Sequence, residues 1–282
     1  MESTSSTDLY LPFLLALFQL QPVTILSVFF LTLARLVPII VLAPFMGGKN
    51  FPVTIRIMFA TALVALFLPQ NLLAIQQEIP YDFFWVTLML KELLIGIVLG
   101  FLASIPFFLV QMSGSLIDHS RGSSALQVND PTTQSQTGPI GVLFNYTLLA
   151  IFFTLNGPFL FFDGLAVSYA LVPVDQFMSQ TLIIQGGTYW KYVSTLLGMM
   201  FSLSVRLAAP AIIGILLTDL FLGIANRLAP QVQIVFLGIS LKSWVGIALL
   251  AASWGLVMMV MGRESLNWFK ALNQFIQQGG SL

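Results

Sequence analysis

The sequence predicts an all-α, polytopic integral membrane protein built of helical hairpins. Of its 282 residues, 57% are hydrophobic and only 8% are charged, whereas a soluble domain usually has about 25% charged residues. So few charges cannot cover a water-exposed surface, and the chain must be surrounded by lipid, by partner subunits or by both. Several apolar runs are also near the length of about 20 residues that crosses a bilayer as a helix.

These runs define the expected elements in chain order. The segment 9–20 is too short to span a bilayer and is expected to lie at an interface or against a partner. Spanning helices are expected at 23–46, 57–75, 83–110 and 192–218. Near the C-terminus, 232–239 is short and 245–261 is close to the lower limit for a span. We expect all of them to belong to one domain, 1–282.

One apolar run, 140–173, is too long for a single crossing, since as one helix it would measure roughly 50 Å. The triplet Asn156-Gly157-Pro158 lies in its middle and is typical of a helix break. The two halves are each short for a span, so a tight helical hairpin is expected here.

A polar island, 111–139, lies between apolar runs and is expected to form a long central loop. Its glycines and serines make it pliable, and Asp130-Pro131 sets a turn. Such a loop can plug, line or gate a passage; the alternative is a plain exposed connector, against which its length argues. The candidate loop residues are Gln111, Gly114, Asp118, Arg121, Gly122, Asp130, Pro131 and Gln134.

Four charges fall inside the apolar runs: Arg35, Lys91, Glu92 and Arg206. A charge at the bilayer centre costs a few kcal/mol, so such residues normally face the protein interior or water. Glu92 shares a helix face with Gly96 and Gly100, a small-residue pair that lets another helix approach closely. Glu92 is therefore expected to point into a helix–helix interface. Two interpretations of Glu92 fit this pattern. One is a structural ion pair with Arg35, Lys91 or Arg206, and the other is a contact for assembly or a charge that faces a channel.

Catalytic and cofactor motifs are missing from the sequence. There is no HExxH, Walker or GxGxxG motif, no cysteine, and a single histidine, His119. A catalytic triad needs a defined geometry that neighbours in the chain rarely provide. Eleven basic and eleven acidic residues cancel, so no global field attracts nucleic acid. We therefore expect no enzyme activity, no cofactor and no metal.

The segment from Asp219 to Gln231, DLFLGIANRLAPQ, resembles the signature of the SctT/FliR family of type III secretion export apparatus proteins. Its most specific part is Asn226-Arg227-x-x-Pro230-Gln231. Weaker matches follow the family's order along nearly the whole chain: Ala34-Arg35-Leu36, Ala43-Pro44-Phe45, Pro52, Arg56, Lys91-Glu92, Gly96, Gly100, the island residues, Asn156-Gly157 and Ser168. Two departures are Pro158, where many relatives have His, and Gln233, where Asn is more usual.

The resemblance implies a non-enzymatic subunit of the export gate of an injectisome or flagellum, with the injectisome SctT type favoured. Expected partners are SctR/FliP-type and SctS/FliQ-type subunits, the SctU/FlhB-type switch protein, unfolded secretion substrates and the lipid of the bacterial inner membrane. The island would contribute to a plug that closes the channel, and Asn226, Arg227, Pro230 and Gln231 would serve assembly.

Two other classes of function are weighed against this one. A small-solute transporter or channel would use Glu92, Arg206 and the broken helix at Asn156-Gly157-Pro158 as a charged site at the membrane midplane. A membrane-embedded hydrolase would need a nucleophile constellation that the sequence does not contain.

Overall fold

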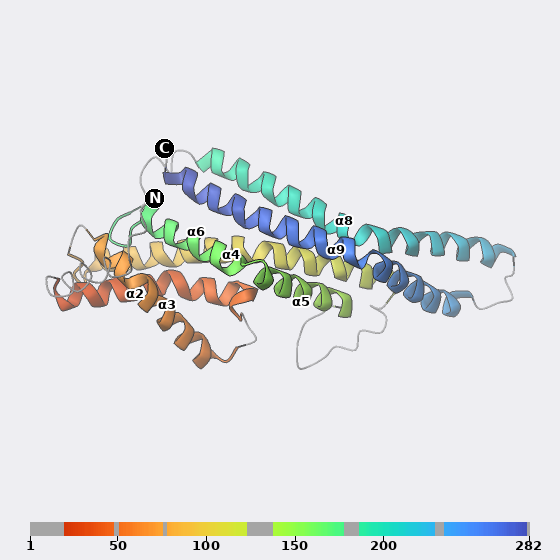
Figure 1. The fold of residues 1–282 in the computed structure, drawn as a ribbon, viewed down its shortest axis with the longest axis horizontal. Helices are drawn as coiled ribbons and strands as arrows, with labels where there is room; N and C mark the ends of the chain where they lie inside the picture. The colour runs from red at the N-terminus through yellow and green to blue at the C-terminus, as the bar shows by residue number, and fades with distance from the viewer. Residues whose placement is uncertain are drawn as a thin grey trace. The chain divides into compact units, whose positions relative to one another are not determined.

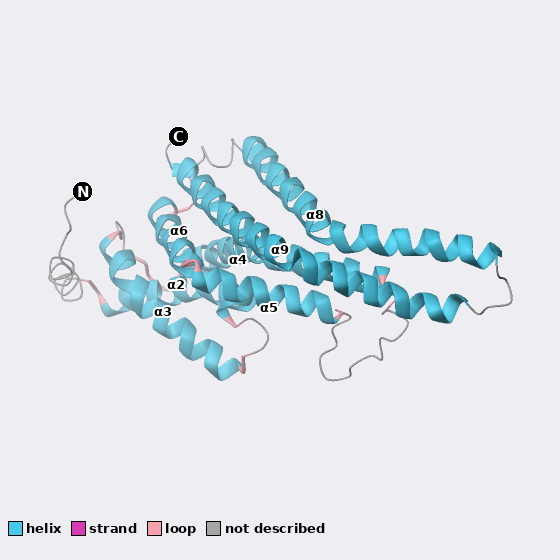
Figure 2. Ribbon diagram, turned by 45° about the vertical axis from the view of Figure 1, so that its right-hand side comes forward, coloured by secondary structure: helices cyan, strands magenta, loops and turns pink. Residues whose placement is uncertain are grey.

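The computed structural model describes residues 20–47, 51–75, 78–122, 138–177, 186–228 and 234–280. These residues form seven α-helices and one short 3-10 helix, with no strand among them (Figure 2). The all-α prediction is confirmed for this part of the chain. The α-helices, labelled in Figure 1, are α2 Pro22–Leu42, α3 Val53–Leu73, α4 Phe83–Ser120, α5 Pro139–Thr154, α6 Gly157–Leu171, α8 Gly186–Leu228 and α9 Ile234–Gly280. The 3-10 helix η1, Pro44–Met46, follows α2.

Five of the described helices are long and apolar enough to cross a membrane: α2, α3, α4, α8 and α9. A sixth crossing results if α5 and α6 count as one broken span. The chain is therefore a multi-pass membrane protein. The described part of the run 232–239 and the run 245–261 instead share one helix, α9, because the serines and Lys242 between them do not interrupt helical hydrogen bonding.

The helix ends follow the local sequence. Pro22 and Pro139 lie in the first turns of α2 and α5, where a missing N–H costs nothing. At its other end, α4 is followed by Gly122, whose φ of 80° is a left-handed conformation that favours glycine. Gly122 N–H donates to the carbonyl of His119 at 3.0 Å and closes the last turn.

The break between α5 and α6 lies at Leu155-Asn156, as the sequence predicts, but the tight hairpin expected there is wrong. The two helices are bent by 74°. Only Asn156 takes a left-handed conformation, with a φ of 57°, and α6 begins at the next residue. One residue of this kind can redirect a helix, whereas reversing it needs a loop of about two to five residues.

The polar island also begins later than expected. Residues 111–120 belong to α4, which continues without interruption to Ser120. Polar residues such as Gln111 and Ser115 do not break a helix when their backbone groups stay paired, and Gly114 has a packing role. A Cβ on Gly114 would lie 2.6 Å from the Cα of Gly141 on α5, so glycine alone permits this contact between the helices.

By packing, the chain divides into two units. Unit 1 comprises Met1–Ser104, Pro158–Tyr189 and Phe269–Leu282; unit 2 comprises Ile105–Gly157 and Trp190–Trp268. In unit 1, α2 packs on α3, and Phe45, Phe161 and Phe269 form an edge-to-face aromatic cluster.

Unit 2 contains two helical hairpins. The second half of α4 packs antiparallel to α5, with Phe107 against Phe152 and Gly114 against Gly141. Within this unit, α8 and α9 run side by side and antiparallel (Figures 1 and 2), with Asp219 paired to Lys242 across them.

Candidate functional site

Three charged side chains gather inside unit 1, from two helices. Arg35 comes from α2, and Lys91 and Glu92 come from α4. Arg35 and Glu92 are 0% exposed, and Lys91 is 9% exposed. We call these residues, with the groups that contact them, the charge cluster.

Glu92 is the anionic centre of the charge cluster. Its carboxylate accepts from Arg35 Nε at 2.5 Å and from Arg35 Nη2 at 3.0 Å, and Lys91 Nζ lies 2.7 Å from Glu92 Oε1. Two parallel N–H···O contacts between a guanidinium and a carboxylate form the strongest kind of ion pair in proteins. A single carboxylate thus holds both cations.

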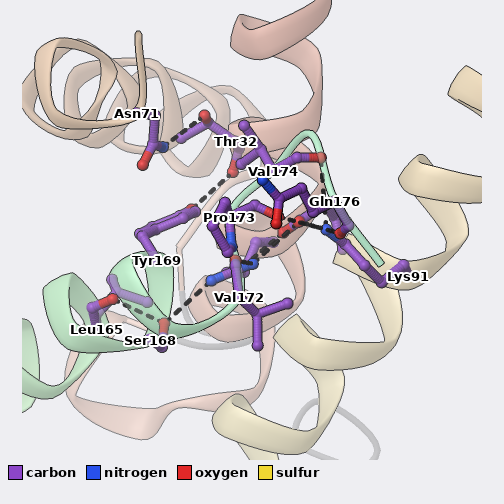
Figure 3. Close-up of polar contacts among 12 residues, drawn as sticks. Thr32, Asn71, Lys91, Leu165, Ser168, Tyr169, Val172, Pro173, Val174 and Gln176 are labelled. Atoms are coloured by element: carbon purple, nitrogen blue, oxygen red, sulfur yellow. Dashed lines mark hydrogen bonds and ion pairs between the residues drawn. The ribbon is translucent and has the colours of Figure 1, made fainter. Parts of the chain in front are cut away.

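Backbone carbonyls after α6 bind the remaining N–H groups of the two cations. Lys91 Nζ donates to the carbonyls of Pro173 and Gln176, each at 2.8 Å, and Figure 3 shows its side chain pointing toward this segment. Arg35 Nη2 donates to the carbonyl of Val172 at 2.7 Å. Carbonyls just beyond a helix end lack intrahelical partners and carry the negative end of the helix dipole, so they suit buried cations.

Side chains of α6 complete the surroundings of Arg35. Its Nη1 donates to Ser168 Oγ at 3.2 Å, and its guanidinium lies 4.1 Å from the centre of the Tyr169 ring. Tyr169 in turn donates its hydroxyl to the carbonyl of Thr32 at 3.2 Å, and Asn71 of α3 donates to the hydroxyl of Thr32 at 2.9 Å. Figure 3 shows this chain of contacts running from α6 through α2 to α3.

The charge cluster therefore ties four helices together by groups of the chain itself. The buried ion pair is bonded on both partners, which is the condition under which buried charges are tolerated. Asp175, a further buried carboxylate, lies close enough to interact electrostatically with Lys91. In this arrangement the cluster acts as a lock on the packing of unit 1.

Two glycines of α4 bring the backbones of α2 and α4 together beside this lock. A Cβ on Gly96 would collide with the carbonyl oxygen of Arg35, and one on Gly100 would lie 3.0 Å from the Cα of Ile39. Glu92, Gly96 and Gly100 thus all face α2. The absence of side chains at the two glycines is what allows the short Arg35–Glu92 bonds.

A second ion pair lies in unit 2, at the end of α4. Asp118 is fully buried, pairs with Arg121 one turn later, and accepts from the backbone N–H of Ile140 at 2.9 Å and of Gly141 at 3.2 Å. These N–H groups open α5, where a carboxylate is favoured by the helix dipole. We call this arrangement the Asp118 clasp, because it joins the end of α4 to the start of α5.

The partners of the Asp118 clasp are tightly packed. A Cβ on Gly138 would lie 2.6 Å from the Cβ of Asp118, so a larger residue there would displace the carboxylate. The stem of Arg121 packs against Gly246 of α9. His119, which follows Asp118 in the chain, is exposed.

The remaining predicted site residues belong neither to the charge cluster nor to the Asp118 clasp. Arg206 was expected to be buried, which is wrong: it is exposed on α8. Asn226 and Arg227 are exposed near the end of α8, Gln111 is half-buried in α4, and Gly122 ends that helix. The predictions for Asp130, Pro131, Gln134, Pro230 and Gln231 lie outside the described residues.

Sequence reasoning missed the groups that bind the buried cations. Pro173 marks the end of an apolar run, which signals a helix end with unpaired carbonyls. No local signal shows which distant side chains those carbonyls meet. Tyr169 and Asn71 have no sequence feature that distinguishes them from ordinary core or cap residues.

No group of three or more His, Cys, Asp or Glu side chains within the described ranges could hold a metal ion. The fold and its paired buried charges define a multi-pass helical membrane protein whose polar interior serves packing. More specifically, the chain belongs to the family described as "Bacterial export proteins, family 1", whose model matches residues 26–267. This is the SctT/FliR family of type III secretion export proteins, as the sequence motifs predict.

Several relatives span the two branches of that family. The chain is 33% identical to "Secretion system apparatus protein SsaT" of Salmonella typhimurium over 169 residues, which cover 60% of this chain and 63% of that one. It is 29% identical to "Flagellar biosynthetic protein FliR" of Bacillus subtilis, over 83% of this chain and 88% of that one. It is also 32% identical to "Yop proteins translocation protein T" of Yersinia pestis, over 62% and 66%.

Proposed function

We propose that the chain is a non-enzymatic subunit of a type III secretion export gate in the bacterial inner membrane. In this role it helps to form and close the channel through which unfolded substrates cross, together with SctR/FliP-type, SctS/FliQ-type and SctU/FlhB-type subunits. The family match over residues 26–267 carries the proposal. The injectisome is favoured over the flagellum by Gln231-Val232-Gln233, although relatives of both kinds match.

An exposed face of α8 supports assembly with other subunits. Met199, Arg206, Ile213, Leu217 and Leu220 follow helical spacing along one face, and all are exposed. Arg206 forms none of the salt bridges among the described residues. An arginine in the middle of a span does not face lipid without a cost of a few kcal/mol. A partner helix that carries a carboxylate would remove this cost.

The Asp118 clasp supports a closing role for the segment between α4 and α5. It brings together the two points at which that segment leaves and re-enters the helices, Gly122 and Gly138. If this polar segment closes the channel, the clasp would fix both of its attachment points to the helices.

A small-solute transporter fits the structure less well. Such a site needs charged groups left available to a substrate at the membrane midplane. In unit 1 the cations Arg35 and Lys91 already bind Glu92 and backbone carbonyls. Glu92 is 0% exposed, so a solute would have to break the lock to reach it.

Co-expression tests the assembly role. We expect the chain to co-purify with SctR/FliP-type and SctS/FliQ-type subunits from the same operon, and to conduct no solute alone in liposomes. Solute flux by the purified chain alone would favour the transporter instead.

A substitution in the Asp118 clasp tests the closing role. Asp118→Ala removes the acceptor of two backbone N–H groups and should let ions leak through the assembled complex in a planar bilayer. His119→Ala, one residue further and exposed, should leave the complex as tight as the wild type. If Asp118→Ala lowers the yield of the complex, shortening the polar segment within 125–135 gives the same test without touching the clasp. A tight seal in both variants would refute the plug role.

A further inference from the structure

An open-sided groove of about 580 Å³ runs between α5 and α9 in unit 2. The rings of Phe144 and Trp254 contact each other at a tilt, with centroids 6.0 Å apart, and a Cβ on Gly262 would lie 3.3 Å from Leu155. The two helices therefore run in the same direction along the groove. The groove thus has one end near Trp254 and another near Gly262. Every residue that lines the groove belongs to unit 2, which makes the groove a feature of that unit alone.

The walls of the groove are apolar. Ile151 and Leu155 of α5 face Trp254, Met258 and Met259 of α9. Two threonines also line it, but both hydroxyls donate to carbonyls of their own helix, Thr147 to Leu143 at 2.7 Å and Thr154 to Ala150 at 2.8 Å. They therefore present mainly methyl groups. Methionine side chains adapt to flexible apolar ligands better than branched ones do.

One charge lines the groove, and it is at one end. Arg263 lies two residues after the end of the apolar run 245–261, at the point where α9 becomes polar. It is exposed and takes part in none of the salt bridges among the described residues. An arginine at the end of an apolar stretch extends its guanidinium to the level of the lipid headgroups.

We propose that this groove binds an anionic phospholipid, with one acyl chain along Met258 and Met259 and the phosphate at Arg263. Its volume lies within the range of roughly 300–1,000 Å³ typical of small-ligand sites, which are also apolar with a few polar groups. An unpaired guanidinium also matches a phosphate, which it can bind in a bidentate manner.

This inference needs only that the chain lies in a bilayer, and it does not rest on the proposed gate role. The two can fail separately, because lipid binding is measured on the chain alone and gating is measured on the complex. The probes are phosphatidylglycerol, which is anionic, and phosphatidylcholine, which has no net charge.

Native mass spectrometry of the full chain in mild detergent with both lipids provides the test. The wild type should retain phosphatidylglycerol in preference to phosphatidylcholine. Arg263→Gln should lower this preference about fivefold, the effect of one basic residue at an anionic surface. Lys270→Gln is the matched control, because it removes the same charge two turns further along α9, outside the groove.

A second pair of variants tests the apolar part of the site. Ala150→Trp fills the groove from an exposed position and should reduce retention of both lipids, whereas Val142→Trp, exposed on the same helix outside the groove, should not. A phosphatidylglycerol with a photoreactive acyl chain should label the peptide around Met258 and Met259 in the wild type. Equal retention of the two lipids by the wild type, an unchanged preference in Arg263→Gln, or labelling elsewhere would each overturn the proposal.

Discussion

Arg35 and Arg206 are both arginines within apolar helices, yet their surroundings are opposite. Arg35 is fully buried in unit 1, where it binds Glu92, Ser168, a backbone carbonyl and the face of Tyr169. Arg206 is exposed on α8 among large apolar side chains. None of the ion pairs between described residues includes it.

The difference separates two uses of charge in a membrane protein. A charge whose partners all belong to its own chain stabilises one packing of that chain, because moving any helix would leave an ion uncompensated. A charge without such partners adds nothing to the fold of the isolated chain. We propose that such a charge finds its partner outside the described chain and therefore serves assembly. Substitutions in the charge cluster should therefore change the stability of the isolated chain, whereas substitutions of Arg206 should change the yield of the assembled complex.

Glu92→Gln should have the largest effect on stability. The amide keeps the shape of the side chain but leaves Arg35 and Lys91 without their carboxylate inside unit 1. Breaking a buried pair in this way typically destabilises by about 3–5 kcal/mol. The measurement is the free energy of unfolding of the purified chain in detergent micelles, followed by circular dichroism.

Glu78→Gln is the control for this substitution, since Glu78 is exposed and binds only at the surface, to Gln21 at 3.2 Å. Its stability should match the wild type within the error of the experiment. A Glu92→Gln chain as stable as Glu78→Gln would mean that the charge cluster does not hold the helices. The comparison with Arg206 would then lose its basis.

Gly96→Ala should have the next largest effect. An added Cβ would meet the carbonyl oxygen of Arg35, which is backbone and cannot rotate away, so α2 and α4 must separate. Overpacking of this kind costs about 1–3 kcal/mol. The same unfolding measurement applies.

Gly255→Ala is the control for this prediction, because the same substitution there is not expected to lower stability. No atom of the described residues lies within 4 Å of a Cβ built on Gly255 of α9, and alanine favours a helix over glycine by up to about 1 kcal/mol. We expect Gly96→Ala to lower the unfolding midpoint and Gly255→Ala to leave it unchanged or raise it. If both variants were stabilised, the close approach of α2 and α4 would not be needed for the fold.

The helices and one helix contact could be predicted from the sequence, but the groups that bind the buried cations could not, and the reasons are physical. The helices are encoded locally by long apolar runs, and Asn156 and Pro139 mark their ends. A helix contact on this face of α4 could be predicted because Glu92, Gly96 and Gly100 recur at helical spacing, although the spacing did not say that the contacting helix is α2. The backbone carbonyls after α6 that bind the cations could not be predicted, because every residue type carries such a carbonyl.

Errors came from residues whose local preference is ambiguous. The island residues 111–120 look like a loop by polarity, yet helix-compatible residues between an apolar helix and Gly122 simply prolong α4. The hairpin expected at Asn156 was wrong because the break contains only two non-helical residues, of which one is left-handed. Arg206 was expected to be buried by the argument that intramembrane charges face an interior. That argument is sound for the assembled protein but does not say which chain provides the interior.

Arg206→Gln should have the smallest effect on the isolated chain and a clear one on assembly. The unfolding free energy should equal that of the wild type, because no group of the described chain loses an ion-pair partner. The yield of complex co-purified with the other gate subunits should fall, and Arg206→Glu should lower it further, since like charges in a desolvated contact repel. Lys270→Gln, also exposed, is the control for the loss of one positive charge.

A suppressor of Arg206→Glu that exchanges an acidic residue of a partner helix for a basic one would identify the partner directly. Full assembly of Arg206→Glu would instead show that α8 meets water at this point, and Arg206 would then belong to the lining of the channel.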